Sequence, residues 1–230
     1  MDLSQRYSRN RQTISEKDQL KLASSTVAII GCGGLGGYIA EELTRLGVGH
    51  LILIDADRLE VSNLNRQIMA TELNLGEWKI EAAQKRLYSI NSEIKVDLVK
   101  EWFDENNGAD LLREVDLVCD ALDSLPARVA LERVCHKMNI PLVFASIAGW
   151  YGLLGVSLPG DYSVAQLFSR GGERGIERTL GNPAFTPAVL ASLSVAEAVK
   201  ILMGLPLSLR HAWLQVDLLS MEFERFEMTI

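Results

Sequence analysis

The chain has 230 residues, of which 48% are hydrophobic and 23% charged, and its formal net charge is −7. These values are typical of a soluble globular protein with one large or two small domains, and the negative charge argues against broad electrostatic binding of nucleic acid. We see no apolar run of about 18 residues that would span a bilayer and no apolar signal-peptide core at the N-terminus, so we expect a cytoplasmic protein without membrane or nucleic acid partners.

Strands and helices are expected to alternate over the first two thirds of the chain. Residues 1–25 are polar with scattered leucines and predict a helical N-terminal arm. Apolar and β-branched runs predict strands at Thr26–Ile30, Leu51–Ile54, Ile94–Val99, Val115–Cys119 and Pro141–Ser146. Helical patterns cover Leu35–Leu46, Lys79–Ile90 and Pro126–Met138, and a short helix ends within Asp110–Glu114. This order favours an α/β fold, a Rossmann-like, doubly wound, mostly parallel sheet.

The pattern changes after Ser146. Gly149–Leu158 is expected to be extended, and residues 161–181 have few apolar residues, which predicts a mobile loop. Thr186–Met203 predicts a long buried helix. Ala212–Val216 and Met221–Phe226 predict a hairpin, so we expect C-terminal antiparallel strands beside the parallel sheet.

Glycines directly after the first predicted strand indicate a phosphate site. Gly31, Gly33 and Gly36 fit the pattern G-x-G-x-x-G, in which the first glycine makes a tight turn, the second lets the backbone approach phosphate and the third packs the helix on the strand. The N-terminus of the following helix offers free N–H groups to an anion. Gly34 is an additional glycine within the motif, which suggests a ligand other than the usual dinucleotide.

Polar residues after the next strands favour a triphosphate. Asp55 ends the second strand, where an acidic residue binds ribose in dinucleotide-binding folds. A dehydrogenase has no need for the Asn and Arg side chains that follow, whereas Arg66 and Lys79 suit phosphate oxygens. Asp123 lies past the fourth strand, where a carboxylate could hold magnesium on the phosphates.

The cysteines and histidines predict no metal centre. Cys32, Cys119 and Cys135 form no C-x-x-C pair and are expected to be buried thiols. The three histidines are scattered without ligand spacing.

Six spaced motifs together resemble the ThiF/MoeB/HesA branch of the ubiquitin-activating-enzyme superfamily. They are Arg6-Tyr7-Ser8-Arg9, Gly31–Gly36, Asp55-x-Asp57, Ser62-Asn63-Leu64-Asn65-Arg66-Gln67, Gly76-x-x-Lys79 and Asp120-x-x-Asp123. The resemblance extends through the chain to the closing strands.

The resemblance implies ATP-dependent adenylation of a C-terminal carboxylate, with release of pyrophosphate. The substrate would be a small β-grasp sulfur carrier protein of the ThiS or MoaD type that ends in Gly-Gly. Residues 1–230 would form a single adenylation domain, in which residues 26–148 bind nucleotide and residues 149–230 bind the carrier, with residues 161–181 as a crossover loop over its tail. Homodimers are expected.

The resemblance also assigns roles to residues. Arg66 and Lys79 would bind the triphosphate, Asp123 would hold magnesium with Ser124 beside it, and Arg9 would reach the phosphates of the neighbouring subunit. Gly34 would contact phosphates and Asp55 the ribose. The other residues expected to line the nucleotide are Gly31, Gly33, Gly36, Asp57, Ser62, Asn63 and Gln67. Catalysis would then consist mostly of positioning and charge neutralisation.

Two departures from the family pattern modify these expectations. Many members bind structural zinc through two C-x-x-C pairs, which this sequence lacks, so we expect no zinc. Some members carry a cysteine in the crossover loop, whereas no cysteine follows Cys135 here. The activity is therefore expected to stop at the acyl-adenylate.

Three alternatives remain at this point. An ATP-dependent tRNA-modifying dehydratase of the same superfamily shares the glycine, Asn-x-x-Arg-Gln and Asp-Ser motifs, although the acidic balance argues against tRNA binding. A non-catalytic subunit that only docks a carrier would have no need for Arg66, Lys79 and Asp123 together. An NAD-dependent oxidoreductase fits the glycines but not the polar segment.

Overall fold

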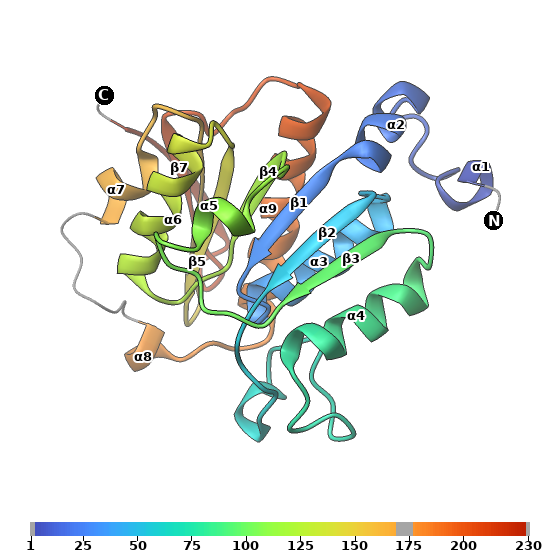
Figure 1. The fold of residues 1–230 in the computed structure, drawn as a ribbon. Helices are drawn as coiled ribbons and strands as arrows, with labels where there is room; N and C mark the ends of the chain where they lie inside the picture. Colours follow the sequence, from blue (N-terminus) through green and yellow to red (C-terminus); the bar gives the residue numbers. More distant parts are fainter. Residues whose placement is uncertain (1–2, 169–176, 229–230) are drawn as a thin grey trace.

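A single eight-stranded sheet organises the chain in the computed structural model, which describes residues 3–168 and 177–228 (Figure 1). Its strands are β1 (Thr26–Ile30), β2 (His50–Ile54), β3 (Lys95–Val99), β4 (Leu117–Asp120), β5 (Leu142–Ala148), β6 (Tyr151–Ser157), β7 (Ala212–Asp217) and β8 (Glu222–Glu227). The order in the sheet is β3-β2-β1-β4-β5-β6-β7-β8. The first five are parallel, and β6, β7 and β8 pair antiparallel. The expected fold class is therefore confirmed.

Helices connect the strands as the periodicity indicated. They are α1 (Leu3–Arg6), α2 (Glu16–Ser24), α3 (Gly34–Leu46), α4 (Lys79–Ile90), α5 (Gly108–Leu111), α6 (Leu125–Lys137), α7 (Ser163–Phe168), α8 (Glu177–Leu180) and α9 (Phe185–Met203). A 3-10 turn, η1, spans Val61–Asn63. The short helix expected to end within Asp110–Glu114 ends there, at Leu111, and Glu114 follows in the left-handed region with φ of 61°.

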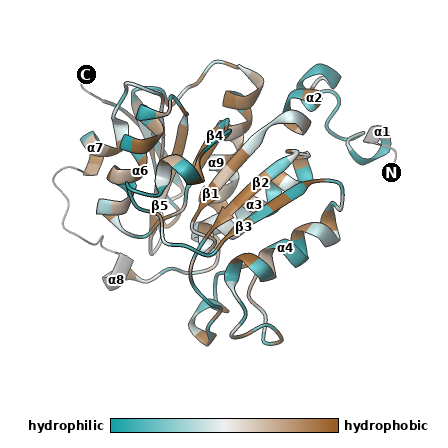
Figure 2. Ribbon diagram, in the orientation of Figure 1, coloured by the Kyte–Doolittle hydropathy of each residue, from teal (hydrophilic) through white to brown (hydrophobic). Residues whose placement is uncertain are grey.

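Apolar residues cover both faces of the sheet. One core joins strand residues such as Val27 and Leu53 to α3, α4 and α9, and the other joins Ile30 and Phe144 to α6 and α7. Figure 2 shows hydrophobic residues concentrated on the central strands, with polar residues on α2 and α4. Burial of both faces explains the near-continuous apolar runs of the parallel strands.

The register brings three strand ends to one level. Ile30 of β1 pairs with both Ile54 of β2 and Asp120 of β4. The loops that follow these strands therefore start side by side, at the carboxyl edge where doubly wound sheets bind ligands.

Helix α9 confirms the long buried helix expected at Thr186–Met203. Within the described residues it is the one helix long and apolar enough to span a membrane by length and composition. Half of that window is buried, and α9 packs against α2, α3, β5 and β6. Because α9 is in contact with other elements on several sides, it is apolar around most of its circumference, whereas a surface helix is apolar on one face only.

Residues 161–181 are partly helical where a loop was expected. The short helix α7 packs against α6, and Glu132 of α6 accepts hydrogen bonds from the N–H groups of Val164 (2.7 Å) and Ala165 (2.8 Å). A buried carboxylate thus satisfies two of the free donors at the start of this helix. The expected mobility of residues 169–176 lies outside the described residues.

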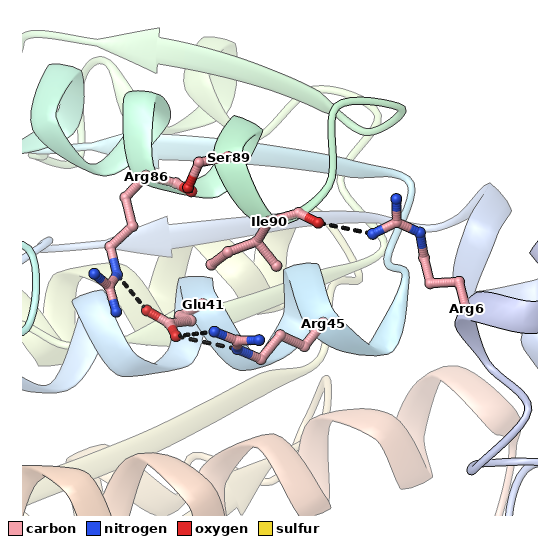
Figure 3. A network of polar contacts seen from close by, with 6 residues as sticks. All are labelled: Arg6, Glu41, Arg45, Arg86, Ser89 and Ile90. Carbon is pink, nitrogen blue, oxygen red and sulfur yellow. Dashed lines mark hydrogen bonds and ion pairs between the residues drawn. The ribbon is translucent and has the colours of Figure 1, made fainter. Parts of the chain in front are cut away.

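A buried carboxylate joins α3 to α4. Glu41 accepts from Arg45 Nη2 at 2.7 Å and from Arg86 Nε at 2.5 Å (Figure 3). Burial favours the protonated carboxyl, but hydrogen bonds from Arg86 and Arg45 outweigh it and lower the pKa of Glu41. The ionised carboxylate therefore contributes to stability.

We expect Glu41→Gln to destabilise the fold by about 1–2 kcal/mol at pH 7, because it removes charge-assisted bonds while both arginines can return to water. Since the pKa is lowered in the folded state, this contribution is present above the ordinary value of about 4.3 and is lost as the pH falls through the folded value. Urea unfolding of both proteins between pH 7 and pH 3 measures the difference. An undiminished difference at pH 3 would contradict the electrostatic origin.

Candidate functional site

The glycine turn is built by close backbone contacts. Gly31 has φ of +91°, and a Cβ there would lie 2.7 Å from the carbonyl oxygen of Ala121. A Cβ on Gly36 would lie 1.8 Å from the carbonyl oxygen of Gly31. The expected roles of these two glycines, the tight turn and the helix packing, are confirmed. Gly33 occupies the N-cap of α3.

Asp55 holds this turn. Its carboxylate accepts from the N–H of Cys32 at 2.7 Å and from the N–H of Asp57 at 2.8 Å. Burial raises the pKa of Asp55, and Lys79 and the two N–H groups oppose that rise. Asp55 thus links the ends of β1 and β2 through hydrogen bonds that no spacing rule predicted.

Asp57 and Lys79 form an ion pair beside it. Lys79 Nζ lies 2.6 Å from Asp57 Oδ2, with side-chain exposures of 10% and 45% respectively. The N–H of Lys79 also donates to the carbonyl oxygen of Asp57 at 3.0 Å. Lys79 is the first residue of α4, as expected, and its ammonium is held at the same edge as the glycine turn.

The segment between Glu60 and Gln67 packs on the glycines. A Cβ on Gly34 would lie 3.7 Å from Arg66 Cγ, and one on Gly33 would lie 3.6 Å from Gln67 Nε2. Arg66 Nη1 donates to the carbonyl oxygen of Ser62 at 2.9 Å, and Ser62 itself is exposed. The Oε1 atom of Gln67 is buried without a partner in the described residues, so an acceptor beside the glycine turn is unsatisfied.

Asn63 is explained by local structure. Its side-chain oxygen accepts from the N–H of Glu60 at 3.0 Å, and the Glu60 carboxylate caps the backbone of Asn63 in return. This capping box fixes the 3-10 turn that leads to Arg66.

The loop after β4 carries the other predicted carboxylate. Asp123 is exposed, and Ser124 occupies the N-cap of α6 without a side-chain capping bond. Asp120 is buried and accepts from Arg128 Nη1 at 3.1 Å. Asp120 therefore orients the loop from within, while Asp123 faces solvent.

Arg9 does not join the site of its own chain. Tyr7 packs against Gly47, at the C-terminal end of α3, and Arg6 donates to the carbonyl oxygen of Ile90 at 2.7 Å (Figure 3). The glycine turn lies at the other end of α3, 13 residues away or about 20 Å.

The thiols are buried, as expected. Burial raises the pKa values of Cys119 and Cys135 to about 12 and raises that of Cys32 well above its ordinary value. Buried thiols with raised pKa values are poor nucleophiles at neutral pH. No group of three or more His, Cys, Asp or Glu side chains within residues 3–168 and 177–228 could hold a metal ion.

Two contributors were not predicted from the sequence. A Cβ on Gly34 would lie 3.4 Å from Pro187 of α9, so the start of α9 closes the glycine turn. Arg128 binds both Asp120 and the carbonyl oxygen of Leu122. Its position on a helix directly after the Asp120 motif was the available signal, since an arginine on a helix face that packs on a sheet requires a partner.

A glycine turn, a lysine, an arginine and a carboxylate at the carboxyl edge of a doubly wound sheet define a nucleotide-binding protein. The chain belongs to the ThiF family, whose model matches residues 7–229.

Named relatives specify the class of enzyme. The chain is 32% identical over 221 residues to a sulfur carrier protein adenylyltransferase of Thermus thermophilus, covering 92% of this chain and 82% of that protein. It is 34% identical over 206 residues to the sulfur carrier protein ThiS adenylyltransferase of Escherichia coli, covering 87% and 82%. The chain is thus a member of an adenylyltransferase family, which uses ATP.

A solved structure is also similar. The E. coli tRNA N6-threonylcarbamoyladenosine dehydratase TcdA in complex with ATP superposes with a TM-score of 0.75 at 27% identity, covering 87% of this chain and 95% of that one.

Proposed function

We propose that this enzyme adenylates the C-terminal carboxylate of a small, ubiquitin-like sulfur carrier protein that ends in Gly-Gly and releases pyrophosphate from ATP. The observation that carries the proposal is the convergence of Lys79, Arg66 and the glycine turn at one edge of the sheet. Named relatives that act on sulfur carrier proteins support the choice of substrate.

The reaction needs charge neutralisation more than a nucleophile. Attack of a carboxylate on the α-phosphate brings two anions together, and cationic donors that are already in place stabilise the resulting charge. Arg66 and Lys79 would bind the triphosphate, and the N–H groups at the start of α3 would face it beside Gly33 and Gly34. Asp55 would bind ribose while it holds the turn, and Asp57, Ser62, Asn63 and Gln67 would line the nucleotide.

The donor set at the end of β4 fits magnesium. Magnesium bound to a nucleotide takes one or two protein carboxylates in addition to phosphate oxygens. Asp123 is an exposed carboxylate that, among residues 3–168 and 177–228, has no hydrogen bonds like those that hold Asp55 and Asp120. Asp123 would therefore hold the metal, with Ser124 beside it, and the metal would draw charge from the phosphates.

Three further assignments belong to this proposal. The enzyme would be a cytoplasmic homodimer in which Arg9 reaches the phosphates of the other subunit. Residues 149–230 would bind the carrier, with residues 161–181 over its tail. Because all three thiols are buried, the product would leave as a free acyl-adenylate without a covalent enzyme link.

The test is ATP–pyrophosphate exchange with purified ThiS-type and MoaD-type carriers, each compared with a form that lacks the last glycine. We expect exchange with one intact carrier and at least a 100-fold loss with its truncated form, because the new terminal carboxylate ends one residue, about 3.5 Å, short of the α-phosphate. ATP binding without exchange for any such carrier would contradict the proposal.

The ATP complex of TcdA favours a second candidate, an ATP-dependent tRNA-modifying dehydratase. The net charge of −7 argues against it, because neutralising tRNA phosphates requires a basic surface. Retention of tRNA at 150 mM salt together with absent carrier-dependent exchange would favour the dehydratase.

A further inference from the structure

Arg128 binds two groups of one turn from inside the protein. It is 3% exposed, and its Nη1 lies 3.1 Å from Oδ2 of Asp120, which is 1% exposed. Its Nη2 donates to the carbonyl oxygen of Leu122. One guanidinium therefore spans from the end of β4 to the middle of the loop that follows.

The remaining contacts leave this turn little freedom. Leu122 N–H donates to Asp120 Oδ1 at 2.9 Å, so both peptide groups of Leu122 are bound within the Asp120–Arg128 pair. Ala121 N–H donates to the carbonyl oxygen of Ile30 at 2.9 Å, and Ser124 accepts from the N–H of Arg128 at 3.1 Å. Asp123 lies between these fixed residues.

Stability alone is a weak reason for such a pair. Burial of two charges costs free energy that their attraction only partly returns, so apolar residues of similar size would serve a core as well. Arginine presents two Nη atoms in a fixed planar fork, one for the carboxylate and one for the carbonyl, whereas lysine has a single, freely rotating ammonium nitrogen. The arrangement at Arg128 uses that property on the turn that carries Asp123.

We propose that Arg128 is a positioning residue that sets the Leu122–Ser124 backbone so that the Asp123 carboxylate faces the metal-bound triphosphate. The inference rests on the proposed function, since Asp123 acquires this role only if magnesium-ATP binds there. Arg128 itself would touch neither ATP nor metal.

The test compares the affinity for α,β-methylene-ATP with magnesium and with EDTA, measured by isothermal titration calorimetry on the full chain. We expect magnesium to tighten binding at least tenfold in the wild type and less than about threefold in Asp123→Asn. Arg128→Met and Arg128→Lys should lose the magnesium effect similarly, because methionine has no donor and the single nitrogen of lysine cannot take the places of both Nη atoms, which bind Asp120 and Leu122.

Glu132→Gln is the matched control. Glu132 lies one helical turn further along α6, is 2% exposed, and binds α7 without a hydrogen bond to the Asp123 turn. It should keep the tenfold effect of magnesium, whatever its loss in thermal stability. If Arg128→Met does not fold, Arg128→Lys decides, because its ammonium can still pair with Asp120.

Either of two outcomes would overturn the inference. The first is a full magnesium effect in a folded Arg128 variant, which would show that the Asp120–Arg128 pair only stabilises the core. If Asp123→Asn still loses the magnesium effect in that case, the proposed function stands and only the role of Arg128 is wrong. A wild type that does not bind the analogue would overturn the proposed function as well.

Discussion

Replacing Lys79 with alanine should lower the rate of carrier adenylation by about 100- to 1,000-fold, the effect of removing one charge-stabilising donor from a prepared site. Lys79 is 10% exposed in its side chain and is held at the glycine turn by Asp57. Its ammonium is therefore positioned before ATP arrives. ATP–pyrophosphate exchange under saturating ATP and carrier measures the loss.

Lys85→Ala is the control for this experiment. Lys85 lies on the same helix, but its side chain is 67% exposed and pairs with Glu77. Exposed pairs of this kind contribute little, so we expect exchange within about twofold of the wild type. Unchanged exchange in a folded Lys79→Ala enzyme would show that Lys79 does not bind the triphosphate. Equal losses in both variants would show that the substitutions act by disturbing the structure of α4.

Lys79 could be predicted because its evidence is local in the sequence. Gly76 precedes it by three residues, and a helical pattern begins at it. The strands predicted at Thr26–Ile30 and Ile94–Val99 are observed at Thr26–Ile30 and Lys95–Val99 for the same reason, since apolar runs bounded by glycine or polar residues are typical of buried strands.

Features that depend on distant partners could not be predicted. Helix α7 is six residues long, and its start is bound by Glu132, more than thirty residues earlier. Arg128 donates to the backbone carbonyl oxygen of Leu122, and no sequence pattern indicates which carbonyl a side chain will bind. The place of Arg9, beyond the far end of α3, follows from the packing of Tyr7 on Gly47, whereas its role in the neighbouring subunit was an expectation from the family resemblance alone.

The second large effect is expected on stability, when a methyl group is added at Gly36 of the glycine turn. Gly36→Ala should destabilise the protein by about 2–4 kcal/mol, because the added methyl would lie 1.8 Å from the carbonyl oxygen of Gly31 and the backbone must move. The gain in helix propensity, about 1 kcal/mol, offsets only part of this cost. Thermal unfolding should show a decrease in Tm of at least about 5 °C.

Gly37→Ala tests whether the contact with Gly31, rather than the loss of a helical glycine, causes that effect. A Cβ on Gly37 would lie 3.3 Å from Met69 Cγ, at a flexible side chain that can move away. We expect its Tm to stay within about 3 °C of the wild type, since helix propensity and tighter packing act in opposite directions.

Because the Gly31 carbonyl belongs to the turn held by Asp55, Gly36→Ala should also weaken ATP binding at least tenfold at a temperature where it is fully folded. A folded Gly36→Ala protein with unchanged ATP affinity would mean that the turn tolerates displacement and that Lys79 and Arg66 determine binding without it.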